Sequence, residues 1–127
     1  MNNIKRVLII EDESSLMKIM REKFSGQNFS CIEARNGEEG LKIALEQHPD
    51  LILLDIIMPK MDGIEVLTRL RNDEWGKNSK IIMLSNLSDS SRLEEAKKLG
   101  IIDYLVKTDW KIDTVLEKVL STLSNIK

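Results

Sequence analysis

The chain has 127 residues, of which 42% are hydrophobic and 31% charged, and its formal net charge is −2. A chain of this length forms one domain and buries roughly two-thirds of its unfolded surface without disulfides. The near-neutral charge gives no electrostatic reason to expect nucleic acid or an anionic membrane as the main partner, so we expect this domain to bind neither directly.

Sequence features at the start of the chain favour a cytoplasmic protein. Residues 1–5 lack the apolar region of a signal peptide, and no run of about 18 apolar residues occurs. The single Cys31 cannot form an internal disulfide, which suits a reducing compartment, and we expect it to be a small buried residue of the second strand. No linker or repeat marks a second domain, so residues 1–127 are expected to form one, either free-standing or cut from a longer protein.

Short apolar runs alternate with helical spacings of apolar residues, the pattern of a parallel sheet with crossover helices. We expect strands at residues 4–10, 30–34, 51–54, 81–84 and 103–106, and helices with apolar stripes over 16–24, 41–45, 64–70, 93–99 and 112–123. Helix caps are expected at Ser14 or Ser15, at Asn36, at Ser91 with Glu94, and at Thr108 or Asp109, with Gly100 as a stop.

Right-handed crossovers place helices on both faces of such a sheet. Among the doubly wound α/β folds that this allows, we predict the flavodoxin-like one, with a five-stranded parallel sheet in the order 2-1-3-4-5 and five helices. In that order the carboxyl ends of strands 1, 3 and 5 lie close together, at the crevice where these folds bind ligands.

Charged residues follow these strands. Glu11 and Asp12 follow the first strand, Asp55 the third and Lys107 the fifth. An ionised carboxylate at the rim of a core is costly without a charged partner or a chemical task. One edge of the predicted sheet thus gathers three acids and one amine.

At these positions the chain resembles the receiver domain of two-component response regulators, including chemotaxis regulators, over essentially its whole length. The resemblance rests on Glu11-Asp12, Asp55 with the turn Met58-Pro59-Lys60-Met61-Asp62-Gly63, Ser85 after the fourth strand, and Tyr104 with Lys107. Each feature is weak alone, but together, in order and at strand ends, they are specific.

The resemblance implies that Asp55 accepts a phosphoryl group from a phosphohistidine on a sensor histidine kinase or phosphotransfer protein. Such transfer requires in-line positioning and neutralised oxygens rather than covalent help. Lys107 is expected to pair with Asp55 at rest and with a phosphoryl oxygen after phosphorylation. Ser85 is expected to donate its hydroxyl to a second phosphoryl oxygen. The domain is then not an enzyme, although it promotes its own phosphorylation and dephosphorylation.

Three neighbouring acids repel one another unless a cation intervenes, and Mg²⁺ prefers oxygen ligands. We expect Asp12, Asp55 and, by the family pattern, the backbone carbonyl of Ile57 to ligate Mg²⁺, with Glu11 acting directly or through water. The resemblance further implies that Ser85 and Tyr104 relay the signal to the surface of the fourth helix, fifth strand and fifth helix. The output protein stays open, as does the choice between a monomer and a phosphorylation-dependent dimer.

The chain departs from the family pattern at three positions. Thr108 replaces the proline that usually follows the lysine in a cis linkage, so a trans or a strained cis peptide must hold Lys107. Asn86 replaces a small residue, and we expect it to hinder attacking water and slow loss of the phosphoryl group. Ser85 replaces the commoner threonine.

Of the other candidates, His48 is not expected to bind a metal, and Trp75 and Trp110 are expected to cover the core.

Three rival functions remain. An aspartyl phosphatase typically has a second acid two residues beyond its nucleophile, where this chain has Ile57. A flavin or nucleotide binder would need a glycine-rich phosphate loop, and the first strand is followed instead by acids. A pseudo-receiver that only binds a partner is disfavoured by the complete set of acid, hydroxyl and amine residues.

Overall fold

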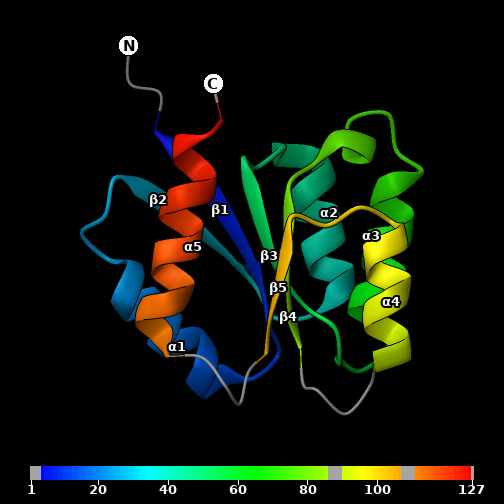
Figure 1. Cartoon of the computed structure of the whole chain (residues 1–127), viewed down its shortest axis with the longest axis horizontal. Helices are drawn as coiled ribbons and strands as arrows, with labels where there is room; N and C mark the ends of the chain where they lie inside the picture. The colour runs from blue at the N-terminus through cyan, green and yellow to red at the C-terminus, as the bar shows by residue number, and fades with distance from the viewer. Residues whose placement is uncertain (1–3, 86–89, 107–110, 127) are drawn as a thin grey trace.

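A computed structural model of the chain describes residues 4–85, 90–106 and 111–126, without the side chains of Ser85 and Ser90. Its strands are β1 (Lys5–Ile10), β2 (Phe29–Ala34), β3 (Leu51–Asp55), β4 (Ile81–Ser85) and β5 (Asp103–Val106). They form one sheet in the order β2-β1-β3-β4-β5 with every neighbouring pair parallel, so the predicted topology is confirmed (Figure 1).

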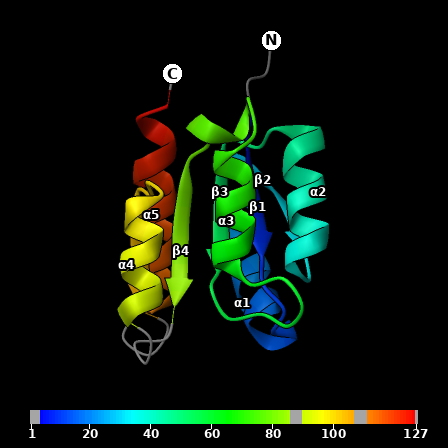
Figure 2. The ribbon, with the colours of Figure 1, turned by 90° about the vertical axis from the view of Figure 1, so that its right-hand side faces the viewer.

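The helices are α1 (Ser14–Phe24), α2 (Gly37–Gln47), α3 (Gly63–Arg71), α4 (Ser90–Lys98) and α5 (Ile112–Ser124), with a short 3₁₀ helix, η1 (Gly76–Asn78), after α3. Helices α1 and α5 cover one face of the sheet (Figure 1). Helices α2, α3 and α4 stand side by side on the other (Figure 2). No helix within the described residues is long and apolar enough to cross a membrane.

The sheet is buried on both faces, which explains why its central strands are continuous apolar runs. In β1, Val7 and Ile9 belong to the core under α1 and α5, whereas Leu8 and Ile10 belong to the core under α2, α3 and α4. All four side chains are fully buried. The backbone that ends in the candidate site is therefore held from two sides.

The helix starts agree with the predictions only in part. Asn36 caps α2 and accepts the Glu39 N–H at 2.8 Å, as expected. The cap predicted at Ser14 or Ser15 is wrong, because the chain stays extended through Glu13, and Ser14 already belongs to α1. The backbone N–H of Glu13 is bound by the Glu11 carboxylate at 3.0 Å, so the preceding acid fixes where this helix begins.

The caps predicted for the last two helices are also wrong. Ser91 lies inside α4, which starts at Ser90, so it cannot be the residue before the helix. Extended backbone at Lys111 makes it the N-cap of α5, one turn later than the predicted Thr108 or Asp109. Several capping residues in succession leave the sequence ambiguous about which one starts the helix.

Exposure differs from the predicted apolar stripes at a few positions. Ile19 is 47% exposed and Leu45 is 37% exposed, since the buried faces of α1 and α2 are centred on other residues. Cys31 is half-buried rather than buried, and desolvation, with a smaller contribution from Glu33, raises the pKa of its thiol to about 11. This thiol stays protonated at neutral pH, which makes it a poor nucleophile.

Trp75 covers the core as predicted. Its half-buried ring packs against the core residues under α2 to α4 and stacks on the exposed His48, with ring centroids 4.4 Å apart and planes inclined by 7°. The corresponding expectation for Trp110 lies outside the described residues.

Candidate functional site

Two adjacent parallel strands bring the predicted acids together. Ile10 at the end of β1 lies opposite Leu54 of β3, so the residues that follow each of them, Glu11 and Asp55, emerge at the same edge of the sheet. With Asp12 they form a cluster in which one carboxylate oxygen from each residue lies within 4.8 Å of the others. Strand pairing therefore gathers residues that are more than 40 positions apart in the chain.

The cluster combines two buried acids with one exposed acid. Glu11 is fully buried and Asp55 is 2% exposed, whereas Asp12 faces solvent. Glu11 is fixed locally, because its N–H donates to the Ala34 carbonyl at 3.0 Å and its carboxylate accepts the Glu13 N–H at 3.0 Å. The acids thus occupy defined positions, with Asp12 on the side open to solvent.

The donor set fits a small hard divalent cation. All three side chains offer carboxylate oxygens, which Mg²⁺ prefers, and opposite ligands of one octahedral Mg²⁺ are separated by about 4.2 Å. The oxygens of the cluster already lie within 4.8 Å of one another, so a single ion can contact them after small adjustments. Carboxylates this close together also repel one another, which a cation relieves.

The loop from β3 to α3 packs directly against Asp55. The Ile56 N–H donates to the Leu84 carbonyl at 3.1 Å, and the Gly63 N–H donates to the Ile56 carbonyl at 2.8 Å. A Cβ on Gly63 would lie 2.8 Å from the Ile56 Cα and closer still to the Asp55 carbonyl oxygen. Ile57, whose carbonyl was predicted as a ligand, lies in this loop with its side chain 51% exposed.

The remaining predicted site residues belong to β4 and β5. Ser85 is the last residue of β4 and lies opposite Val106, the last residue of β5, at the edge that carries the acids. Lys107 follows Val106 in the chain. The Ser85 side chain and the whole of Lys107 lie outside the described residues, as do Asn86 and Thr108, so the expectations for them stay predictions.

Tyr104 stands in the middle of β5, half-buried against the core under α2 to α4. The Lys97 ammonium, in the last turn of α4, lies 5.0 Å from the centroid of its ring. Lys97 is also bound to Glu94 at 3.2 Å, and this contact, together with the charge of Glu94, raises the pKa of Lys97. The predicted relay residue therefore contacts the helix whose surface it is expected to change.

Sequence reasoning missed one contact at the rim of the site. The Asp62 carboxylate caps α3 by accepting the Glu65 N–H at 2.9 Å and also pairs with Arg92 in the first turn of α4. Asp62 and Glu65 have the spacing of a capping box, which could have revealed the cap. No local sequence pattern indicates its partner Arg92, which lies 30 residues further along the chain.

Comparison with known proteins identifies the family. The family model for the response regulator receiver domain matches residues 7–119. This chain belongs to that family. Receiver domains are signalling domains of two-component systems that bind Mg²⁺ at an acidic site, interact with histidine kinases or phosphotransfer proteins, and act on output domains. The recognition made from the strand-end residues is therefore confirmed.

Individual relatives agree with this assignment. The chain is 37% identical to the probable transcriptional regulator ycf27 of Porphyridium aerugineum, over 95% of this chain and 52% of that protein. It spans about half the length, or less, of the curated relatives that it matches first. The receiver domain of Francisella response regulator 1452 superposes with a TM-score of 0.86 and 29% identity, over 97% of this chain and 99% of that one.

A second solved structure is the CheX-CheY-BeF3-Mg+2 complex from Borrelia burgdorferi, similar with a TM-score of 0.82 and 30% identity. The match covers 97% of this chain and 90% of that chain. Together these structures confirm the predicted flavodoxin-like fold.

Proposed function

We propose that this domain accepts a phosphoryl group on Asp55, with Mg²⁺ held by the neighbouring acids, and signals through the surface of α4, β5 and α5. One observation carries the proposal: the Asp55 carboxylate, at the end of β3, lies with Glu11 and Asp12 in a single cluster. Similarity to a CheY whose solved complex with CheX contains BeF3 and Mg+2 supports the same assignment.

The chemistry assigned to Asp55 is a simple displacement. A carboxylate oxygen of Asp55 attacks the phosphorus of a phosphohistidine, the phosphorus–nitrogen bond breaks, and the imidazole leaves with the electron pair. The product is an acyl phosphate on Asp55. Such a transfer is accelerated mainly by positioning and by stabilisation of oxygen charge. The fixed backbone around Asp55 supplies the positioning.

The acids stabilise the charge on the phosphoryl oxygens indirectly, because they hold the metal ion. Asp12, Asp55 and the Ile57 carbonyl are the proposed ligands, with Glu11 binding directly or through water. When bound, Mg²⁺ offsets the carboxylate charges and neutralises the developing charge on phosphoryl oxygens. Because Asp12 is the exposed member, it lies on the side from which an ion and a phosphodonor can approach.

Lys107 and Ser85 complete the proposed site. Lys107 pairs with Asp55 at rest and with a phosphoryl oxygen afterwards, while the Ser85 hydroxyl donates to another phosphoryl oxygen. Movement of Ser85 frees space into which Tyr104 turns, and the surface of α4, β5 and α5 changes. A local charge thereby biases a two-state packing element.

The proposed phosphodonor is a sensor histidine kinase or phosphotransfer protein, and the proposed receiver of the signal is an output protein or domain. Residues 1–127 act as one domain in this scheme. The domain binds no nucleic acid directly, and it is a monomer or a dimer that forms on phosphorylation.

Intact mass spectrometry after incubation with acetyl phosphate and Mg²⁺ tests the proposal. We expect the addition of one phosphoryl group, which is absent in Asp55→Asn and after removal of Mg²⁺ with EDTA. Hydroxylamine should remove the group, because it cleaves acyl phosphates and leaves phosphoserine intact.

A matched control is Glu46→Gln, which removes an exposed carboxylate of α2 remote from the cluster and should leave the labelling unchanged. Labelling of Asp55→Asn to the wild-type extent, or no labelling of the wild-type chain, would refute the proposal.

A further inference from the structure

One ion pair joins the start of α3 to the start of α4. The Arg92 guanidinium donates to the Asp62 carboxylate, and both side chains are 31% exposed. The two residues border a groove of about 340 Å³ between these helices, together with Glu65, Glu95 and Lys60. The pair is therefore a partly buried link between segments 30 residues apart, within a mixed set of charges.

Asp62 has two tasks at this position. Its carboxylate accepts the Glu65 N–H as the N-cap of α3, and it binds Arg92. Burial opposes ionisation of this group, but the hydrogen bonds from the Glu65 backbone and from Arg92, with the charge of Arg92, hold its pKa below the ordinary value. Asp62 is thus a carboxylate at neutral pH, which both the cap and the ion pair require.

The next residue touches the phosphorylation site itself. Gly63 follows Asp62, donates its N–H to the Ile56 carbonyl at 2.8 Å, and lies too close to the Asp55 carbonyl for any side chain. A displacement of the start of α3 consequently moves the backbone on which Asp55 stands. The residue that makes this contact is therefore adjacent in the chain to the one that Arg92 holds.

We propose that Arg92 is a positioning residue for phosphorylation of Asp55: through Asp62 it holds the start of α3 and the adjoining backbone of Asp55 and Ile56. This inference rests on the proposed function of Asp55. Because Arg92 belongs to α4, the same contact couples the phosphorylation site to that helix. A partner that displaces the first turn of α4 would therefore break this contact and release the start of α3.

Four single variants and the double variant Asp62→Asn/Arg92→Gln test the ion pair without disturbing the cap. Asp62→Asn keeps an equally good N-cap but removes the charge. Arg92→Gln removes the cation, and Arg92→Lys restores it. Arg69→Gln is the matched control, since it breaks the exposed Arg69–Glu65 pair on the same helix, at 2.8 Å, without touching Asp62. Urea unfolding confirms that each variant is folded under the assay conditions.

The readout is the rate of phosphorylation by acetyl phosphate at saturating Mg²⁺. We expect Arg92→Gln and Asp62→Asn each to slow it roughly two- to fivefold, the range that partly exposed ion pairs reach. The double variant should be no slower than either single variant, Arg92→Lys should recover most of the rate, and high salt should shrink the difference. Arg69→Gln should match the wild type.

Wild-type rates in Arg92→Gln, additive losses in the double variant, or equal slowing by Arg69→Gln would overturn the role of Arg92. These results are distinct from failure of the proposed function, in which the wild-type chain is not labelled or the label persists in Asp55→Asn.

Discussion

Gly63 is the residue at which the fold leaves least freedom next to Asp55. Its missing side chain lets the first turn of α3 lie against the carbonyl of Asp55 and the Cα of Ile56. Both neighbours are backbone atoms in or directly after the central strand β3, so neither can yield by changing a rotamer. The glycine is required here by close approach, and its φ is not in the left-handed region.

Gly63→Ala should therefore displace α3 from the end of β3. We expect a loss of about 1 to 3 kcal/mol in the free energy of unfolding, as for other overpacked sites, and slower phosphorylation by acetyl phosphate. Gly26→Ala is the control: Gly26 has a φ of +83° and no atom near its Cβ position, so alanine there costs backbone strain alone. Equal phosphorylation rates in the two variants would contradict this role of Gly63.

Among individual residues, the sequence predicted the acids of the site but not the residues around them. Glu11, Asp12 and Asp55 follow apolar runs, and parallel pairing of those strands places them together. Arg92 carries no such signal, because its contact with Asp62 depends on how two helices pack. The first helix start was mispredicted for a similar reason: the Glu11 side chain binds the Glu13 N–H, and a propensity for caps does not foresee this.

Among the elements, α4 is tied at both ends to the segment around α3. Arg92 binds Asp62 at its start, and beyond its last turn the Arg71 guanidinium donates to the carbonyls of Leu99 and Gly100, each at 2.6 Å. Arg71 belongs to the end of α3. Changes at the proposed phosphorylation site therefore have a direct route to the start of α4, whereas the segment that follows α4 is held by hydrogen bonds from the Arg71 side chain.

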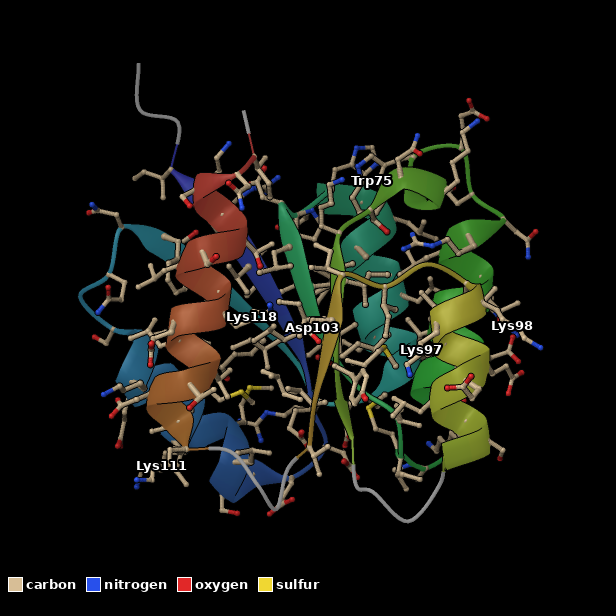
Figure 3. All side chains as sticks on the ribbon, in the orientation of Figure 1. Trp75, Lys97, Lys98, Asp103, Lys111 and Lys118 are labelled. Atoms are coloured by element: carbon tan, nitrogen blue, oxygen red, sulfur yellow. The ribbon has the colours of Figure 1, made fainter. Side chains whose placement is uncertain are left out.

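The contact between Lys97, in the last turn of α4, and Tyr104 links this helix to β5. A cation near the face of an aromatic ring is attracted by the negative potential of that face. Lys97 is directed toward β5, whereas the neighbouring Lys98 lies on the outer side of α4 (Figure 3). The contact stabilises the present orientation of the Tyr104 ring, and hence the resting state if Tyr104 is the relay.

Lys97→Ala should shift the Tyr104 ring toward its inward orientation, changing the ratio of the two orientations roughly two- to fivefold. Tyr104 is the only tyrosine of the chain, so a ¹⁹F-labelled tyrosine reports on it alone in an NMR titration with acetyl phosphate. The variant should need less phosphorylation for the same change in signal. Lys98→Ala is the matched control, and an identical response from the two variants would remove Lys97 from the switch.

Across the whole molecule, the apolar pattern determined more than any single motif. Continuous apolar runs predicted a sheet covered on both faces, which is confirmed. Right-handed crossovers allow several doubly wound strand orders, and the one predicted among them, 2-1-3-4-5, is confirmed as well. The predictions were wrong at some helix boundaries and at Ile19 and Leu45. These two residues belong to the predicted apolar stripes but are exposed, because packing buries a narrower face of each helix. Long-range polar contacts such as Asp62–Arg92 could not be predicted, because they depend on the packed helices.

The fold also brings three acids together at one edge of the sheet, and this has a consequence for stability. Strand pairing holds three carboxylates together, and the repulsion among them is a cost to the native state that a bound cation lowers. A cation that binds only the folded site offsets this cost and shifts the equilibrium by mass action.

Mg²⁺ at ten times its dissociation constant should therefore add about 1.4 kcal/mol to the free energy of unfolding. Urea titrations with MgCl₂, and with NaCl at matched ionic strength, measure the gain apart from screening. Asp12→Asn removes the exposed acid, so it should be at least as stable as the wild type without Mg²⁺ and gain less when Mg²⁺ is added. An equal gain in Asp12→Asn, or in NaCl, would place the effect elsewhere than at the acidic cluster.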